Sequence, residues 1–389
     1  MLKLLRTGCQ SKRKSKLKNN TMDLGDIIDK FEIEGSITET RKFGTGLINS
    51  TFKIISKEHD APDYILQSIN SEVFTNIPEL TSNIQRITSH IQKKLKDTLE
   101  LNRHCLTVIF TKEGAGYYKD PSGKYWRVFL LIKGSRTIEK MSSEIQAEAA
   151  GNAFASFQEM MSDLPAPALF DVLPGFHNTN LRIDNLKNSV RLNKFDRLEE
   201  VQNEVEYLLS FEAEMGKVIN LGKQGRLPLR NVHQDAKLSN ILFDENDEVL
   251  CVIDLDTVMS GYLCYDFGDA VRSGMNTGRE DDENLDNISL DMTLFKGFAN
   301  GYCQASKGFI TIEEVETLVF GAKLITYEQA VRFLEDYLNG DSYYQTSKEK
   351  HNLIRTRAQI KFFEALVENY DEMYLYVKGL YSDEFISRN

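Results

Sequence analysis

The chain has 389 residues, of which 41% are apolar and 27% are charged, close to the average for a folded globular protein. This composition excludes disordered, collagen-like and fibrous proteins, and no apolar run approaches the roughly 18 residues that a membrane-spanning helix needs. The net charge is −11, although the first 20 residues hold seven cations and no acid. The rest of the chain is therefore strongly acidic and is not expected to bind nucleic acid, since phosphate contacts need clustered Lys and Arg.

The basic segment at residues 1–22 lacks the continuous apolar stretch of a secretory signal. We predict a disordered leader, with Met22 as a second candidate start, and a targeting segment or a membrane-surface tail as the alternative. The five cysteines form no CxxC pair and the six histidines no HExxH motif, which argues against a disulfide framework and a zinc site. A cytoplasmic location, no membrane partner and a monomeric or weakly dimeric chain are expected.

Residues 23–133 are predicted to form a β-rich lobe with one helix. Short runs rich in Thr, Ile and Phe predict strands at 39–43, 49–55 and 63–68. Apolar residues at helical spacing predict a helix over 78–95, and two further strands are expected at 106–111 and 125–132. This order predicts an antiparallel sheet with one helix laid against it.

After Gly134 helical patterns dominate, and no proline follows Pro228. Thr311 and Glu314 form a capping-box pattern ahead of a long amphipathic run that continues towards Gly340. Two short β-like runs at 240–244 and 249–253 are the exception. The predicted fold class is therefore α+β, with a small antiparallel lobe at 23–133, a connector near 131–134 and a larger helical lobe at 134–389.

The segment HQDAKLSN at residues 233–240 is the most informative about chemistry. His233, Asp235 and Asn240 fit the H-x-D-x4-N spacing of a kinase catalytic loop. In that geometry Asp235 takes the proton of the acceptor hydroxyl and the Asn240 oxygen binds magnesium. Asp254 ends an apolar strand fourteen residues later and supplies a second hard oxygen ligand. Lys237 is placed to contact the transferring phosphate, whereas His233 is expected to brace the loop.

Two further motifs need interpretation. Asp266 begins an Asp-Phe-Gly sequence that spells the protein-kinase metal motif, but it lies 26 residues beyond Asn240, too far for that role. We predict that Asp266 accepts backbone N–H bonds and steadies the catalytic loop. The segment Gly44-Thr45-Gly46, with Asn49 after it, lies between two predicted strands, where glycines let backbone N–H groups approach ATP phosphates. The alternative is an ordinary hairpin turn.

Together these motifs resemble the aminoglycoside phosphotransferase and choline kinase superfamily, which shares the protein-kinase fold. Within it, several stretches resemble the N-acetylhexosamine 1-kinases: LQSIN at 66–70, FHNT at 176–179, VIDLDTV at 252–258, YDFGDA at 265–270 and RFLEDYLNGD at 332–341. The resemblance extends over roughly residues 23–370. It implies a two-lobe kinase-like fold and transfer of the ATP γ-phosphate to the anomeric C1 hydroxyl of an N-acetylhexosamine.

The resemblance also implies roles for particular residues. It makes Asp235 the base, Asn240 and Asp254 the Mg²⁺ ligands, residues 44–49 the nucleotide loop, and the connector after Phe129 the hinge that contacts adenine. ATP and Mg²⁺ are the implied cofactors.

One position departs from the general kinase pattern. Gln67 stands where the third strand usually carries a Lys, and the helix predicted at 78–95 has no Glu after Glu79 to pair with one. A Gln can hydrogen-bond a phosphate but cannot neutralise it. We interpret Gln67 as a nucleotide-binding subfamily trait, because the 1-kinase-like sequences also place Gln there and Lys237 supplies a cation. The alternative is a nucleotide-binding pseudokinase scaffold.

A hexosamine needs several side-chain hydrogen bonds and an aromatic or apolar wall. The candidate sugar contacts are Asp256, His177, Asn178, Arg332 and Asp341. Three of these residues have a plainer alternative: a third metal oxygen for Asp256, a helix-face ion pair with Asp336 for Arg332, and a solvated loop for His177.

Other acceptors fit the same fold. An aminoglycoside, an amino alcohol or another sugar is the alternative substrate, and the acidic chain would suit a cationic drug, but the substrate-side stretches favour an N-acetylhexosamine. A protein kinase is least expected, because nothing after Asp256 resembles an activation segment ending in Ala-Pro-Glu.

Overall fold

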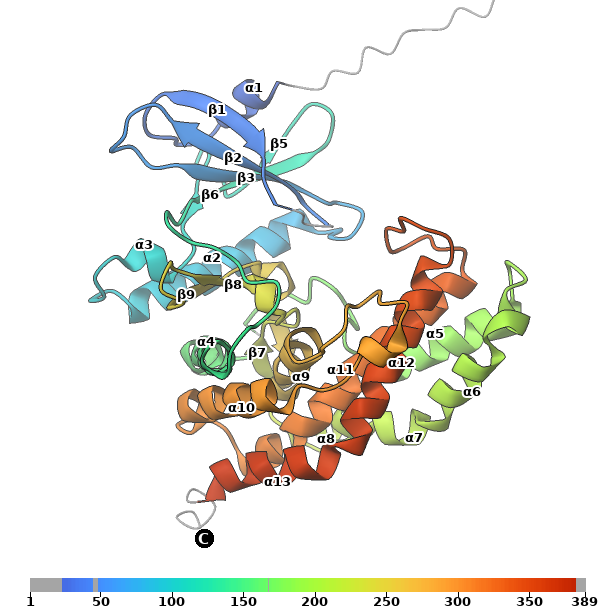
Figure 1. Cartoon of the computed structure of the whole chain (residues 1–389). Coiled ribbons are helices and arrows are strands. Elements are labelled where there is room, and N and C mark those ends of the chain that lie inside the picture. Colours follow the sequence, from blue (N-terminus) through green and yellow to red (C-terminus); the bar gives the residue numbers. More distant parts are fainter. Residues whose placement is uncertain (1–22, 45–47, 167, 383–389) are drawn as a thin grey trace, which may run out of the picture.

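The computed structural model describes residues 23–44, 48–166 and 168–382. The predicted leader at 1–22 and the predicted nucleotide-loop residues Thr45 and Gly46 lie outside these ranges. The described chain forms a small β-rich lobe and a larger helical lobe (Figure 1). None of its described helices is long and apolar enough to cross a membrane.

The β-rich lobe is built on one antiparallel sheet in the strand order β1-β2-β3-β6-β4, with β5 paired to β6. Its strands are β1 (Ile37–Lys42), β2 (Ser50–Ser56), β3 (Tyr64–Ile69), β4 (Val108–Ile109), β5 (Tyr118–Lys119) and β6 (Tyr125–Leu130). In the β3–β6 register Gln67 lies opposite Arg127. The predicted antiparallel sheet is confirmed, with the strand at 106–111 shortened to two residues.

The predicted helix is α2 (Ile77–Lys94), which lies between the sheet and the helical lobe (Figure 1). The Asn76 side chain caps its first turn, and Pro78 fits there because that turn needs no N–H donor. Its apolar stripe is buried against Ile69 and Phe129 of the sheet and Phe157 of α4. The prediction of a single helix in this lobe was wrong, since the short helices α1 (Leu24–Ile28) and α3 (Leu101–His104) are also present. Helices of four or five residues are too short to show a periodic apolar pattern.

A short connector joins the lobes after β6. Gly134 adopts a φ of +70°, a left-handed conformation that favours glycine. Ile132 is buried against Leu250 and Cys251 of the helical lobe. The connector is therefore anchored on the helical lobe.

The helical lobe is organised around α11 (Ile312–Leu338), which is buried along most of its length. The predicted capping box is confirmed: Thr311 Oγ1 accepts from Glu314 N at 3.2 Å, and Glu314 Oε2 accepts from Thr311 N at 2.9 Å. The other helices are α4 (Glu144–Met161), α5 (Thr179–Leu192), α6 (Gln202–Ser210), α7 (Glu212–Met215), α8 (Lys217–Lys223), α9 (Leu263–Gly274), α10 (Met292–Ser306), α12 (His351–Glu368) and α13 (Tyr370–Leu380).

Two small antiparallel pairs complete this lobe. They are β7 (Arg230–Val232) with β10 (Met259–Gly261) and β8 (Ile241–Phe243) with β9 (Val249–Val252). The second pair is the hairpin predicted from the β-like runs at 240–244 and 249–253. Residues 233–240 lie between β7 and β8, so the two pairs fix both ends of this segment.

Helices α4 and α10 cross in backbone contact through glycines. A Cβ atom added at Gly151 would lie 2.0 Å from the Phe298 carbonyl oxygen, and one added at Gly301 would lie 1.9 Å from the Glu148 carbonyl oxygen. Backbone atoms cannot rotate aside as a flexible side chain can. This crossing therefore requires glycine at both positions.

We expect the Gly151→Ala substitution to lower the free energy of unfolding by about 2 kcal/mol or more, because the helices must separate. The matched control is Gly379→Ala in α13, where an added Cβ meets nothing within 4 Å. There alanine is expected to be neutral or to stabilise the protein by up to about 1 kcal/mol. Urea unfolding of both variants checks this, and equal effects would contradict the packing argument.

Candidate active site

The catalytic loop begins directly after β7 and is fixed by Asp266 of α9. The carboxylate of Asp266 is fully buried and accepts from His233 N at 2.8 Å, Gln234 N at 2.7 Å and Gln158 Nε2 at 2.8 Å. Burial raises the pKa of Asp266, against the effect of His233 and of these hydrogen bonds. With its N–H held in this way, Gln234 adopts a φ of +64°, and the chain turns so that Asp235 follows at the surface of the lobe.

His233 ties this loop to the segment that carries Asp254. Its Nε2 donates to the Ile253 carbonyl at 2.9 Å, and its Nδ1 accepts from Asp235 N at 3.3 Å. The ring is fully buried, with Phe154 and Phe157 at centroid distances of 6.1 and 5.8 Å. Both ring nitrogens are therefore occupied by backbone partners.

Asp235 and Lys237 form an ion pair at the centre of the site, with Lys237 Nζ 2.8 Å from Asp235 Oδ2. Burial works against the charge of Asp235, but Lys237 outweighs it and lowers the pKa of Asp235 to about 2. Burial likewise opposes the charge of Lys237, whose pKa is nevertheless raised by Asp235 and Asp254. Both groups are thus charged at neutral pH, so the carboxylate is ready to accept a hydrogen bond from a hydroxyl group.

The β8–β9 hairpin brings Asn240 beside Asp254. Ile241 lies opposite Val252, and Ile253 N donates to the Asn240 carbonyl at 2.8 Å. The Asn240 amide nitrogen donates to the carbonyl and the carboxylate of Asp235, at 2.8 and 3.1 Å. Its side-chain oxygen accepts no hydrogen bond from any described residue and remains open to a ligand.

Asp254 has the character of a cation ligand. Its φ is +62° and its side chain is solvent-accessible. Even so, desolvation by neighbouring protein atoms and repulsion from the carboxylates of Asp256 and Asp235 raise its pKa to about 6. Crowded carboxylates favour a divalent cation. The described residues contain no group of three or more His, Cys, Asp or Glu side chains placed to hold a metal. Asn240 and Asp254 offer an amide and a carboxylate oxygen, which could hold an ion such as Mg²⁺ that keeps water and substrate oxygens in its shell.

Asp256 joins the helical lobe to the β-rich lobe. Its two oxygens accept from Arg127 Nη1 at 2.5 Å and Nη2 at 2.9 Å, and Oδ2 also accepts from Asn49 Nδ2 at 2.8 Å. Gln67 lies on the other side of Arg127 and accepts from its Nε at 2.9 Å. The structure therefore brings Asn49, Gln67 and Asp256 together. Gly44 lies two residues beyond β1 with a φ of +74°.

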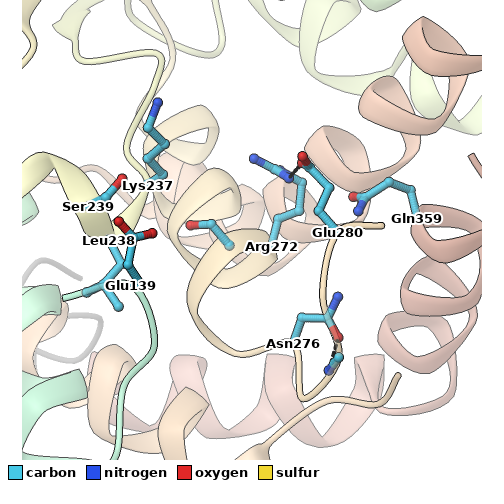
Figure 2. Close-up of a pocket in the computed structure, with 10 residues that line it drawn as sticks. Glu139, Lys237, Leu238, Ser239, Arg272, Asn276, Glu280 and Gln359 are labelled. Carbon is cyan, nitrogen blue, oxygen red and sulfur yellow. Dashed lines mark hydrogen bonds and ion pairs between the residues drawn. The ribbon is translucent and has the colours of Figure 1, made fainter. Parts of the chain in front are cut away.

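A cavity of about 200 Å³ adjoins the catalytic loop (Figure 2). It is lined by Lys237, Leu238 and Ser239 of the loop and by residues from the segment before α4, from α9 and the segment after it, and from α12. The polar members of this second group are Glu139, Arg272, Asn276, Glu280 and Gln359.

The charged groups of the cavity are partly paired. Arg272 Nη1 donates to Glu280 Oε1 at 2.9 Å (Figure 2), whereas Glu139 has no polar partner among the described residues. Gln359 is 1% exposed, and its Oε1 is buried without a hydrogen-bond partner in the described chain. An unpartnered buried amide oxygen is costly, and Gln359 lines the cavity. Sequence reasoning missed these residues, because they are dispersed and belong to no motif.

The predicted sugar contacts do not line this cavity. Each has a protein partner instead: Asp256 pairs with Arg127, His177 with Glu328, Asp341 with Arg197 and Asn352, the Asn178 side chain caps α5, and Arg332 lies over Phe176 and Tyr344. The alternative pairing of Arg332 with Asp336 is absent from the described chain, where Asp336 accepts backbone N–H bonds from residues 342–344.

The solvated-loop alternative for His177 was wrong, since His177 is 8% exposed. Its Nδ1 lies 2.8 Å from Glu328 Oε1, and its Nε2 lies 3.0 Å from the Gln234 carbonyl. Both partners are acceptors, so both ring nitrogens must carry protons. Burial opposes the charges, but the contact raises the pKa of His177 and lowers that of Glu328. The imidazolium therefore supports the catalytic loop at Gln234.

The His177–Glu328 pair makes the free energy of unfolding depend on pH. Because folding raises the pKa of His177, the protonated ring stabilises the fold fully below the ordinary pKa of 6.5. This stabilisation is lost as pH rises through the folded-state pKa. We expect His177→Gln to reduce the free energy of unfolding by more at pH 6 than at pH 9. Thr179→Val removes a second hydrogen bond to Glu328 and is the non-titrating control, with the same cost at both pH values. Urea unfolding measures both, and a pH-independent cost for His177→Gln would contradict the charge assignment.

Comparisons with known proteins agree with this architecture. The phosphotransferase enzyme family matches residues 39–305, so the chain belongs to that family. The fold is similar to an aminoglycoside phosphotransferase from Alicyclobacillus acidocaldarius (12% identity, 95% of this chain and 99% of that one, TM-score 0.55). It is also similar to a microcompartment-associated aminopropanol kinase (14%, 91% and 98%, 0.57) and a choline kinase from Cryptosporidium parvum (12%, 88% and 93%, 0.55). The predicted superfamily and the two-lobe α+β fold are confirmed.

Proposed function

We propose that this protein is an ATP-dependent kinase that transfers the γ-phosphate to the anomeric C1 hydroxyl of an N-acetylhexosamine. The observation that carries the proposal is the arrangement of Asp235, Lys237, Asn240 and Asp254, held by buried partners in the order that phosphoryl transfer needs. The family match supports the phosphoryl transfer, and the sequence stretches that resemble N-acetylhexosamine 1-kinases support the acceptor.

In this proposal the acceptor hydroxyl donates a hydrogen bond to the Asp235 carboxylate. Its oxygen bonds to the γ-phosphorus, the bond from that phosphorus to the β–γ bridging oxygen breaks, and the hydroxyl proton passes to Asp235. Lys237 lies beside Asp235 and moves towards the charge that develops on the transferring group. Asn240 and Asp254 would hold Mg²⁺, which neutralises phosphate charge. Gly44, Thr45, Gly46, Asn49 and Gln67 are the proposed nucleotide-binding residues, and the connector is the proposed adenine contact.

We place the acceptor in the cavity of Figure 2. The cavity adjoins Lys237 and offers polar side chains of both charges, which suits a molecule with several hydroxyl groups. A second candidate is an amine-bearing acceptor, such as an amino alcohol or an aminoglycoside. Glu139 favours it, since this carboxylate has no polar partner among the described residues and is available to an ammonium group.

The test is ADP release from Mg-ATP with a panel of N-acetylglucosamine, N-acetylgalactosamine, other sugars, choline and aminoglycosides. Asp235→Asn serves as the blank, and phosphorus NMR identifies the phosphorylated position. Turnover of an N-acetylhexosamine with a C1-phosphate signal supports the proposal. Turnover of only an amine-bearing compound selects the second candidate, and nucleotide binding without any turnover selects the pseudokinase scaffold.

The acceptor cavity has its own prediction. Gln359→Leu removes a buried amide whose oxygen is unpartnered, so the free energy of unfolding is expected to stay the same or rise. The KM for the acceptor is expected to rise about tenfold through loss of one hydrogen bond, with the KM for ATP unchanged. Steady-state kinetics and urea unfolding check this. An unchanged acceptor KM would exclude Gln359 from the acceptor site.

A further inference from the structure

The β-rich lobe does carry a buried cation beside Gln67, on the neighbouring strand. Arg127 of β6 lies opposite Gln67 of β3 in the antiparallel register. Its Nε donates to Gln67 Oε1 at 2.9 Å, and the Gln67 amide donates to Thr51 Oγ1 at 3.2 Å. Gln67 therefore orients Arg127. The cation that is absent from β3 is therefore present on β6, the neighbouring strand.

The acid that holds this cation comes from an unusual place. In protein kinases the strand Lys pairs with a Glu of the lobe's helix. The corresponding helix here, α2, has Glu79 in its first turn as its single acid. Arg127 pairs instead with Asp256, two residues after Asp254, through two parallel hydrogen bonds of 2.5 and 2.9 Å. Both side chains are nearly inaccessible to solvent, at 4% and 3% exposed.

We propose that Arg127 is the phosphate-binding cation of the nucleotide site and that Asp256 is the acid that positions it. Arginine has five N–H donors, and the contacts to Gln67 and Asp256 use three of them. One N–H on each terminal nitrogen is left, and each can donate one charge-assisted hydrogen bond to a phosphate oxygen. The Phe129 ring, 5.1 Å from the guanidinium carbon, supports the group from one side.

This inference rests on the proposed function. The Arg127–Asp256 pair lies beside residues that the proposal assigns to nucleotide binding. Asn49, at the start of β2, donates to the same Asp256 oxygen that accepts from Arg127 Nη2. A residue of the proposed nucleotide loop therefore lies directly beside the pair. A buried ion pair contributes little net stability after its desolvation cost. Its value here is that it holds a charged donor group in a fixed orientation.

The experiment measures equilibrium binding to the full chain by calorimetry, in Mg²⁺, for ATP, ADP and adenosine. We expect Arg127→Gln to weaken ATP and ADP about 10- to 100-fold, the loss of one or two charge-assisted hydrogen bonds, and to leave adenosine unchanged. Lys57→Gln, an exposed cation at the far end of β2, is the control and is expected to change none of the three. Arg127→Lys is expected to recover part of the loss.

A single substitution leaves Asp256 buried and unpaired, so a second variant is needed. Arg127→Gln combined with Asp256→Asn removes both charges and keeps hydrogen-bonding groups in place. It is expected to show the same selective loss for ATP and ADP. Equal losses for all three ligands, or no loss, would overturn the inference. If the unaltered protein binds adenosine, ADP and ATP equally weakly or not at all, the proposed function itself fails.

Discussion

Asp235→Asn is expected to lower kcat by about 100- to 10,000-fold, the usual range for loss of a general base in the transition state. The amide keeps the shape of the carboxylate, so the contact with Asn240 survives while the acceptor for the hydroxyl proton is lost. Nucleotide affinity is expected to change much less, because Asn240, Asp254 and Arg127 are untouched. The measurement is steady-state ADP release together with ATP binding.

The control for this variant is Asp184→Asn, which changes an exposed acid of α5 with no side-chain partner among the described residues. It is expected to leave kcat unaltered. A kcat for Asp235→Asn within a few-fold of the unaltered enzyme would remove Asp235 from the mechanism. Loss of ATP binding in the same variant would indicate that the loop itself has moved.

Asp266→Ala is expected to lower the free energy of unfolding by about 3 kcal/mol or more, which makes it one of the most damaging single substitutions in the chain. It leaves His233 N, Gln234 N and Gln158 Nε2 without their acceptor in a fully buried place. Each unsatisfied buried group costs about 1–3 kcal/mol. Urea unfolding measures the effect.

Two further variants calibrate that measurement. Asp266→Asn keeps one acceptor oxygen but directs an N–H towards donors, so an intermediate loss is expected. Asp184→Ala changes an exposed acid and is expected to stay within about 0.5 kcal/mol of the unaltered protein. If Asp266→Ala were as mild as Asp184→Ala, the loop would not depend on the α9 carboxylate.

The elements that the sequence predicted well are those whose signals are local. The strands of the sheet, the stripe on α2 and the capping box of α11 follow from periodicity and from caps a few residues apart. The close crossing of α4 and α10 did not emerge, because Gly151 and Gly301 are far apart in sequence and each alone looks like a weak helix residue. Their meaning appears only when the two helices touch.

The site divides in the same way. Asp235, Lys237 and Asn240 lie within one short loop, and Asp254 lies one hairpin away, so their spacing carried the information. Arg127 and Asp256 are 129 positions apart, and the residues of the acceptor cavity come from separate elements. Sequence reasoning assigned Asp256 to the sugar because it did not place Arg127 opposite it.

The two proposed metal ligands, Asn240 and Asp254, flank the β8–β9 hairpin of the helical lobe, whose base is closed by the bond from Ile253 N to the Asn240 carbonyl. Arg127 belongs to the other lobe and reaches the site across the boundary between them. Rotation of one lobe against the other changes the reach of the arginine while the ligand spacing stays constant. Under the proposed function, we therefore expect affinity for Mg²⁺ alone to be independent of such a rotation, whereas affinity for the ATP phosphates depends on it.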